Sequence, residues 1–161
     1  MAFQGEKWRA CQDYSVGTNR AAQSSPFALP TPWDIRGVVE EQTHFVKYDL
    51  RDGFWRVPVS PQLRKRLVMR HPATAKLIWC ASLPFGYIDS PRAFCEVTES
   101  IAGEFRRRVA VRLGGKAYIW CYVDDYLVAG DTEELTRQAG EILEEIFFEL
   151  GVEWAPNKHR G

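Results

Sequence analysis

Two adjacent aspartates, Asp124 and Asp125, lie between apolar residues that are typical of β-strands. Two like charges side by side in a half-buried hairpin cost free energy unless a cation lies between them, so the pair indicates a metal site. A third carboxylate, Asp49, comes near the end of another apolar run, residues 44–50. Three such acids suggest a site that holds two cations and transfers phosphoryl groups. The alternative is that the pair forms a polar turn of an exposed hairpin.

Apolar and β-branched runs predict the strands that would position these acids. We expect a short strand at 7–14, a buried strand at 45–50, a hairpin made of 64–70 and 76–82, and a hairpin at 118–129. The acid pair then lies at the tip of the last hairpin, and the third acid lies at a strand end.

Two helices are expected to pack against these strands. Ser90 as N-cap and Pro91 at the first helical position begin the first helix. Its apolar stripe repeats every three or four residues and contains Phe94, Val97, Ile101, Phe105 and Val109. The second helix begins around 132–135, repeats apolar residues as far as Leu150 and stops at Gly151. This order of elements predicts an α+β fold, an antiparallel sheet backed by two helices.

The composition is that of an ordinary globular protein. The 161 residues are 45% hydrophobic with a mean hydropathy of -0.32, and no apolar run is long enough to cross a bilayer. With no secretory signal visible, we expect an intracellular protein, in the cytoplasm or nucleus, that does not contact a membrane. The four cysteines form no C-x-x-C pair and are predicted to be reduced core thiols.

Five motifs, in matching order and spacing, resemble the reverse transcriptases of retroviruses and retrotransposons, and the resemblance covers nearly the whole chain. They are residues 8–14 (WRACQDY), 49–54 (DLRDGF) with 57–59 (VPV), 83–86 (LPFG) with 90–94 (SPRAF), 122–125 (YVDD) and 155–158 (APNK). The fourth is similar to the signature hairpin of that family, and the second to its first catalytic motif. The fold implied is a polymerase palm-type antiparallel sheet backed by two helices, with partial fingers.

The activity that the resemblance implies is RNA-templated DNA polymerisation. In that chemistry the 3′-oxygen of a primer attacks the α-phosphorus of a deoxynucleoside triphosphate, with two Mg²⁺ ions, or Mn²⁺ in their place, held by carboxylates. Asp49 and Asp124 are the expected shared ligands, and Asp125 is expected to be a weaker or supporting one. The partners implied are an RNA or DNA template–primer and deoxynucleoside triphosphates.

The resemblance also places residues around the nucleotide. Phe54 would lie under the incoming sugar and leave no room for a 2′-hydroxyl, so the substrate should be a deoxynucleotide. The backbone N–H groups around Asp52 and Gly53 could bind triphosphate oxygens. Without the resemblance, Phe54 and Trp55 would be ordinary core aromatics, and for Trp55 that interpretation is preferred.

Three cationic residues are implied to act on the triphosphate. Lys7 and Arg9 would contact it, Arg9 in a bidentate manner, although an exposed strand of alternating charges is an equal alternative for Lys7. Lys158 could donate a proton to the departing pyrophosphate or stabilise its charge.

Three further residues are implied to contact substrate. Tyr122 belongs to the signature hairpin, and the turn that contains Phe85 and Gly86 would approach the template. Gly86 is the position least expected to tolerate a side chain, although a plain loop glycine is the alternative. Phe85 stands where retroviral enzymes typically have glutamine, which favours a retrotransposon origin.

The charges balance, since 21 Lys and Arg face 21 Asp and Glu, which is unusual for a nucleic-acid enzyme. Basic residues gather at 64–66 and 106–108. For the run at 106–108 a solvated helix face is favoured over a nucleic-acid contact.

The expected organisation is a partial fingers segment at 1–44 and a palm at 45–161, with a fingers-like hairpin at 61–83. Thumb and ribonuclease H regions are expected to be absent here and supplied by a parent polyprotein. One alternative is a degraded or domesticated remnant that binds nucleic acid without catalysis. Another is an RNA-dependent RNA polymerase, against which Phe54 argues because a ribonucleotide needs space at the 2′-hydroxyl.

Overall fold

The computed structural model describes residues 2–4, 7–9, 12–23, 26–29, 31–39, 42, 44–71 and 73–155 of the chain. The chain divides into two units. The first unit contains residues 1–27 and 52–94, and the second contains residues 28–51 and 95–161. The predicted boundary between fingers and palm at residue 44 separates functional parts, whereas the two units are defined by contacts. The predicted boundary therefore stays a prediction.

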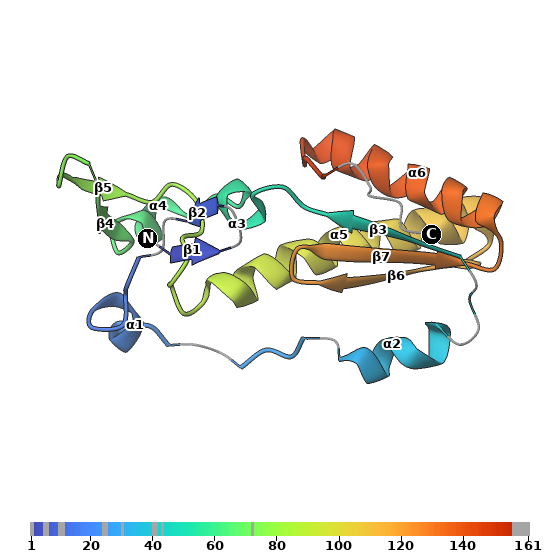
Figure 1. Ribbon diagram of the computed structural model, residues 1–161, viewed down its shortest axis with the longest axis horizontal. Helices are drawn as coiled ribbons and strands as arrows, with labels where there is room; N and C mark the ends of the chain where they lie inside the picture. The colour runs from blue at the N-terminus through green and yellow to red at the C-terminus, as the bar shows by residue number, and fades with distance from the viewer. Residues whose placement is uncertain are drawn as a thin grey trace. The chain divides into compact units, whose positions relative to one another are not determined.

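The sheet of the second unit is antiparallel with strand order β3-β7-β6 (Figure 1). Its strands are β3 (His44–Asp49), β6 (Ala117–Tyr122) and β7 (Asp125–Gly130). Residues of β6 are alternately buried and more exposed along the strand, because successive side chains of a strand point to opposite faces. The strand predicted at 45–50 and the hairpin predicted at 118–129 are confirmed to within one residue.

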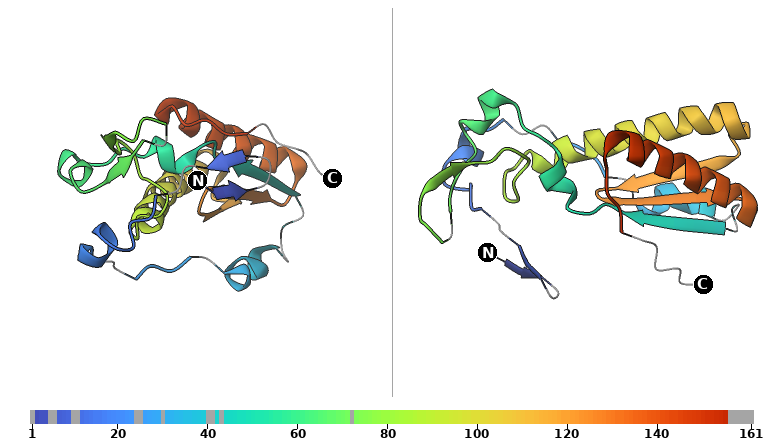
Figure 2. Two further views of the ribbon diagram at one scale, coloured as in Figure 1. Left: turned by 60° about the vertical axis from the view of Figure 1, so that its left-hand side comes forward. Right: turned by 90° about the horizontal axis from the view of Figure 1, so that it is seen from above.

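Two long helices, α5 (Ser90–Leu113) and α6 (Glu133–Leu150), pack on one face of this sheet (Figures 1 and 2). Tyr126 of β7 is buried and contacts both helices. Its hydroxyl donates to the carbonyl oxygen of Thr98 in α5 at 2.9 Å, and its ring meets the ring of Phe147 in α6 edge to face, with centroids 5.5 Å apart. The predicted α+β fold, an antiparallel sheet backed by two helices, is confirmed.

Helix α6 begins and ends where its sequence predicts. The hydroxyl of Thr132 accepts from the N–H of Leu135 at 3.2 Å and caps the first turn. Gly151 adopts a left-handed conformation with φ 64°, which lets its N–H donate to the last carbonyls of the helix. The buried stripe faces the sheet and consists of Thr136, Ala139, Gly140, Ile142, Leu143, Ile146 and Phe147.

Helix α5 differs from its prediction at two positions. Ser90 is the first helical residue rather than the N-cap, because its hydroxyl donates to the carbonyl oxygen of Pro84 at 2.9 Å. Val97, expected in the buried stripe, is 40% exposed, and Thr98 is buried instead. The hydroxyl of Thr98 accepts from the Sγ of Cys121 and donates to the carbonyl oxygen of Cys95, so a polar side chain at this position leaves no unpaired group.

The first unit consists of short elements. They are β1 (Ala2–Gln4), β2 (Lys7–Arg9), α1 (Thr18–Ala21), α3 (Gly53–Arg56), α4 (Pro61–Arg64), β4 (Val68–Arg70) and β5 (Leu77–Trp79), with β1 pairing β2 and β4 pairing β5 in antiparallel fashion. The strand predicted at 7–14 is shorter than expected. The hairpin predicted to begin at residue 64 is also shorter, because Pro61 and the N-cap Ser60 begin a helical turn that extends to Arg64. A further short helix, α2 (Pro32–Val39), belongs to the second unit.

The described cysteines, Cys80, Cys95 and Cys121, are free, and the first and last of them are buried. This agrees with reduced core thiols at those two positions, while Cys11 lies outside the described residues. Among the described helices, none has the length and apolar character needed to cross a membrane.

Candidate active site

The sheet register brings the predicted acids to one end of the second unit. Asp49, the last residue of β3, is the direct partner of Asp125, the first residue of β7. Asp124 lies in the two-residue turn just before Asp125, and its carbonyl oxygen accepts from the N–H of Leu50 at 2.9 Å. Asp49 and the adjacent pair Asp124 and Asp125, far apart in the sequence, are therefore carried by neighbouring backbone segments.

The turn that carries Asp124 is strained. Val123, its first residue, has φ 56°, a left-handed conformation that β-branched residues rarely adopt. Holding such a residue there costs about 1–3 kcal/mol, and strain of this kind is concentrated at functional sites. The backbone strain therefore favours a functional interpretation of this turn over a plain polar hairpin tip.

Lys47, which the sequence analysis did not single out, lies among the three acids. Its Nζ is 2.8 Å from Oδ2 of Asp125. The hydrogen bond that Lys47 donates to Asp125 raises the pKa of Lys47, and the negative charges of Asp125, Asp49 and Asp124 add to this while burial opposes it. The sequence signal was strand alternation, because Lys47 stands two residues before Asp49 and so shares its face of β3.

Asp49, Asp124 and Asp125 offer the carboxylate oxygens that Mg²⁺ and Mn²⁺ prefer. The ammonium of Lys47 beside them indicates that this position accepts positive charge. No three described His, Cys, Asp or Glu residues come close enough together to hold one metal ion. The donor types fit a divalent ion, and the assignment of Asp49, Asp124 and Asp125 as its ligands stays a prediction.

Tyr122 ends β6 directly beside Asp125 and is exposed. Residues two and four positions earlier, Trp120 and Tyr118, share its face of the strand, and their rings stack with centroids 6.3 Å apart. This face is the one opposite α5 and α6, and it carries Asp49 and Asp125. Tyr122 is therefore the member of an aromatic row that lies nearest to them.

In the first unit, Phe54 belongs to an aromatic cluster. Its ring stacks on Phe94 with centroids 4.7 Å apart and lies 5.0 Å from the centroid of Phe85. Gly53 is packed just as closely, since a Cβ there would collide with the ring of Phe94. The glycine thus has a packing role besides any role toward phosphate. Trp55, expected in the core, is 38% exposed, and its ring lies at 70° to the Phe85 ring with centroids 5.8 Å apart.

Gly86 adopts φ 96°, and a Cβ at this position would collide with the carbonyl oxygen of Gln12. The same segments are joined by a hydrogen bond from the N–H of Gln12 to the carbonyl oxygen of Phe85 at 3.3 Å. Asn19 adds a second connection, since its side-chain amide donates to the carbonyl oxygen of Gly86 at 2.9 Å. The glycine is required here by backbone packing, whether or not a template also contacts it.

The remaining predicted site residues are Asp52 and three cations, Lys7, Arg9 and Lys158. Asp52 is exposed and has φ 55°, just before α3. The side chains of Lys7 and Arg9 lie outside the described part of the chain, although their backbone forms β2. Lys158 lies outside the described residues altogether.

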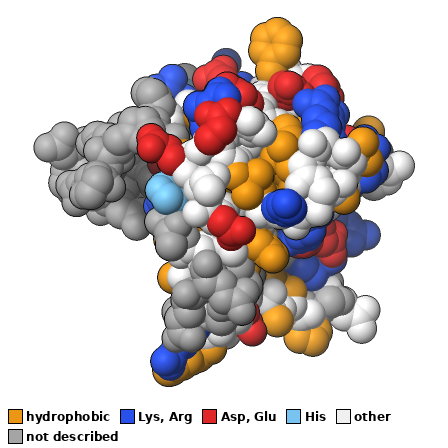
Figure 3. Space-filling view, turned by 90° about the vertical axis from the view of Figure 1, so that its right-hand side faces the viewer, with side chains coloured by type: hydrophobic (Ala, Val, Ile, Leu, Met, Phe, Trp, Pro, Cys, Tyr) orange, Lys and Arg blue, Asp and Glu red, His pale blue; other side chains and the backbone are white. Residues whose placement is uncertain are grey.

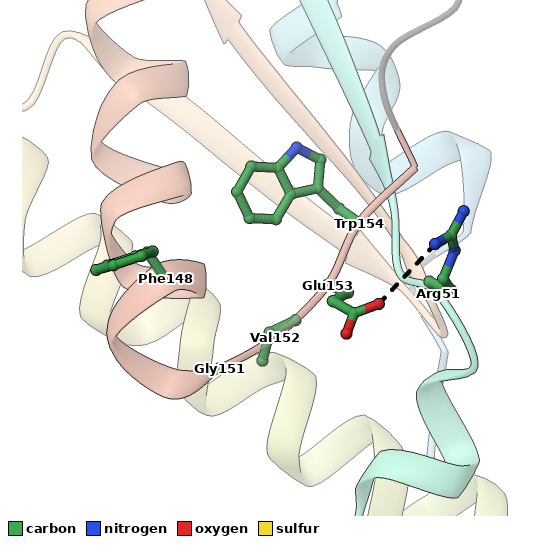
Figure 4. A pocket seen from close by; sticks show the side chains of 6 residues that line it. All are labelled: Arg51, Phe148, Gly151, Val152, Glu153 and Trp154. Atoms are coloured by element: carbon green, nitrogen blue, oxygen red, sulfur yellow. Dashed lines mark ion pairs between the residues drawn. The ribbon is translucent and has the colours of Figure 1, made fainter.

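The segment after α6 pairs with the end of β3, which the sequence did not indicate. Leu50 and Trp154 form a β-bridge, and the N–H of Ala155 donates to the carbonyl oxygen of Asp49 at 2.9 Å. Beside this pairing lies a cavity of about 480 Å³ lined by Arg51, Phe148, Gly151, Val152, Glu153 and Trp154 (Figure 4). Arg51 and Glu153 approach each other at 3.9 Å across it.

The basic run of α5 is paired with acids, as predicted for a solvated helix face. Arg106 bonds Glu99 at 2.6 Å, Arg107 bonds Glu104 at 2.8 Å, and Arg108 reaches Glu149 of α6 at 2.6 Å. Figure 3 views one side of the molecule, where cationic and anionic side chains are interspersed. The run at 106–108 therefore offers little free positive charge to a nucleic acid.

Comparisons with known proteins agree with the resemblance in the motifs. The family model described as "Reverse transcriptase (RNA-dependent DNA polymerase)" matches residues 7–161. The Gag-Pro-Pol polyprotein of bovine leukemia virus (isolate Australian) is 28% identical over 95% of this chain, and that of simian retrovirus SRV-2 is 28% identical over 94%. The Pol polyprotein of feline endogenous virus ECE1 is 27% identical over 79%.

The chain spans only 11%, 8% and 12% of the lengths of these three polyproteins, respectively. The family match, in contrast, extends over most of the chain and includes all three candidate metal ligands. The chain therefore belongs to the reverse transcriptase (RNA-dependent DNA polymerase) family.

Proposed function

We propose that this chain is the catalytic part of an RNA-templated DNA polymerase of a retroelement, which adds deoxynucleotides to the 3′-end of a primer. The observation that supports this most is the pairing of Asp49 with Asp125 across β3 and β7, with Asp124 in the adjoining turn. In a chain of this family, that arrangement supplies the acids for phosphoryl transfer at one end of the sheet.

Asp49 and Asp124 would hold the divalent ions, and Asp125 would support them. Asp125 has the supporting role because the ammonium of Lys47, 2.8 Å away, already neutralises its charge. Two Mg²⁺ ions, or Mn²⁺, would supply Lewis acidity toward the primer 3′-oxygen and the leaving pyrophosphate. The left-handed conformation of Val123 is a kind of backbone strain that is concentrated at functional sites, which supports a role for the turn that carries Asp124.

The substrate contacts are proposed from the family motifs. Phe54 would exclude the 2′-hydroxyl of a ribonucleotide, and the N–H groups at Asp52 and Gly53 would bind triphosphate oxygens. Tyr122 would contact the primer end or the nucleotide. The remaining proposed contacts are those of Lys7, Arg9 and Lys158 to phosphates and those of Phe85 and Gly86 to the template.

The proposed partners are an RNA or DNA template–primer and deoxynucleoside triphosphates, with thumb and ribonuclease H regions supplied by a parent polyprotein. Residues 1–44 would then serve as part of the fingers and residues 45–161 as the palm. An enzyme that copies such templates would work inside the cell, in the cytoplasm or nucleus.

The experiment is primer extension on a poly-ribonucleotide template with Mg²⁺ or Mn²⁺, comparing the wild type with Asp124→Asn. The substitution removes a ligand charge without changing the volume of the side chain. Asp131→Asn is the matched control, because Asp131 follows the opposite end of β7. We expect extension by the wild type and the control and none by Asp124→Asn.

Equal extension by the wild type and Asp124→Asn would overturn the catalytic assignment. A folded wild type that binds template–primer but extends nothing would favour the alternative, a remnant that binds nucleic acid without catalysis.

A further inference from the structure

One stretch of the first unit holds an excess of positive charge. Residues 53–88 contain no Asp or Glu but contain Arg56, Arg64, Lys65, Arg66, Arg70 and Lys76. All of these side chains are exposed. Because the whole chain has a net charge of zero, this stretch is a local basic region in an otherwise balanced protein.

Three of these cations, Arg64, Arg70 and Lys76, are not neutralised by carboxylates of the described part of the chain. Arg64 and Arg70 donate only to backbone carbonyl oxygens, of Val59 and Ala75. No ion pair joins either of them, or Lys76, to a described carboxylate. The arginines of α5 are paired with acids, whereas the charges of Arg64, Arg70 and Lys76 remain available to an anionic partner.

The β4–β5 hairpin in this region exposes apolar side chains on one face. Trp79 is 70% exposed and Leu77 is 69% exposed, and the two lie two residues apart on β5. The register pairs Leu77 with Arg70 of β4, so an arginine lies on the same face. An exposed indole on the same face as a guanidinium that no described carboxylate neutralises is the combination with which proteins bind unpaired nucleic-acid strands, through base stacking and phosphate contacts.

We propose that the face of the β4–β5 hairpin formed by Arg70, Leu77 and Trp79 binds an unpaired nucleic-acid strand. Trp79 stacks on a base, Leu77 extends the apolar surface, and Arg70 contacts phosphate. Identification of that strand as template rests on the proposed function, whereas the surface itself rests on charge and exposure.

The charge of the region favours this partner over two others. A second copy of the chain would bring two basic hairpins together, which like charges oppose. A regular duplex keeps its bases stacked inside, so it would use the cations but not the indole.

The test is the binding of a fluorescently labelled oligouridine RNA, followed by anisotropy over a range of salt concentrations. The variants are Trp79→Ala and Arg70→Gln, and the control is Trp33→Ala, because Trp33 is 74% exposed but belongs to the second unit. We expect Trp79→Ala to weaken binding about tenfold, as for the loss of one stacked base. Arg70→Gln should lower the salt dependence, and Trp33→Ala should bind like the wild type. Circular dichroism checks that each variant is folded.

Equal binding by Trp79→Ala and the wild type, or no binding by the wild type, would overturn the proposal. So would loss of self-association in Trp79→Ala with RNA binding intact, which would identify the face as a contact between copies. The Asp124→Asn variant separates this proposal from the proposed function, since it should lose extension but keep RNA binding. Trp79-dependent binding in a wild type that extends no primer would leave the surface standing and reject the polymerase.

Discussion

The Nζ of Lys47 lies 2.8 Å from Oδ2 of Asp125, on the strand face that also carries Asp49. The lysine gives a site of three carboxylates a formal charge of about −2 instead of −3. It also distinguishes the two adjacent aspartates, because Asp125 has a cationic partner within the protein. A divalent ion that binds at this end of the sheet must therefore compete with the ammonium group for the same negative field.

Replacing Lys47 with Gln should strengthen the binding of a divalent ion. Removal of one positive charge near the site should lower the dissociation constant for Mn²⁺ about threefold to tenfold, as screened electrostatics permit. Electron paramagnetic resonance of free Mn²⁺ measures this without any need for catalysis. Lys116→Gln is the control, because it removes the same charge beyond the opposite end of β6.

The same substitution in an Asp125→Asn background should have a smaller effect if Lys47 acts through Asp125. Equal dissociation constants for Lys47→Gln and Lys116→Gln would contradict the competition between lysine and metal.

Phe54→Ala should let the enzyme incorporate ribonucleotides, since the truncated side chain leaves space for the 2′-hydroxyl. The measurement is the ratio of ribonucleotide to deoxynucleotide incorporation in primer extension. Trp55→Ala is a neighbouring aromatic control that should leave the ratio unchanged. An unaltered ratio in folded Phe54→Ala would make Phe54 a structural member of the cluster with Phe85 and Phe94.

Gly140→Ala should destabilise the second unit. A Cβ on Gly140 would come within 2.6 Å of the hydroxyl of Tyr48, which donates to Glu144 at 3.0 Å. Forcing these apart should cost about 1–3 kcal/mol of unfolding free energy. Gly103→Ala in α5 is the matched control, because nothing lies within 4 Å of its Cβ.

The control should be about 1 kcal/mol more stable than the wild type, since alanine favours the helix over glycine. Chemical denaturation of both variants gives the comparison. Two variants of equal stability would mean that α6 can shift away from Tyr48 without cost.

Acid should weaken the ion pairs that Glu104 forms with Arg107 and Arg108 within α5. Hydrogen bonds from Arg107 and Arg108 lower the pKa of Glu104 from 4.5 to about 2. Because the folded-state pKa is depressed, the stabilisation is present above pH 4.5 and is lost as the pH falls toward 2. The melting temperatures of the wild type and Glu104→Gln should therefore converge over this range, and parallel profiles would show that the pair adds nothing.

Much of the fold could be predicted because its signals are local. The caps at Thr132 and Gly151 and the apolar repeat between them define α6, and alternation defines β6 and β7. The burial of Thr98 in place of Val97 could not be predicted, because it depends on a hydrogen bond from the sulfur of Cys121, which lies on a strand later in the chain. Hydrophobicity alone would predict that Val97 is the buried residue.

The candidate site was predicted in its acids but not in its surroundings. Asp49, Asp124 and Asp125 belong to motifs that can be recognised in the sequence, and their pairing follows from the antiparallel sheet. Lys47 could have been found from its position two residues before Asp49, but its contact with Asp125 needs the register of β3 against β7. The exposure of Trp79 and Trp55 has no sequence signal, because aromatic residues in short strands and helices are normally buried.

The backbone around Asp49 is held by two segments that are distant from it in sequence. Its own carbonyl oxygen accepts from Ala155, and the next residue, Leu50, donates to Asp124. During synthesis these partners leave the ribosome long after β3, so the acid site can be completed only when Ala155 has emerged. Since such long-range contacts form late and slowly, a chain interrupted before this residue would contain all three acids without the support that aligns them.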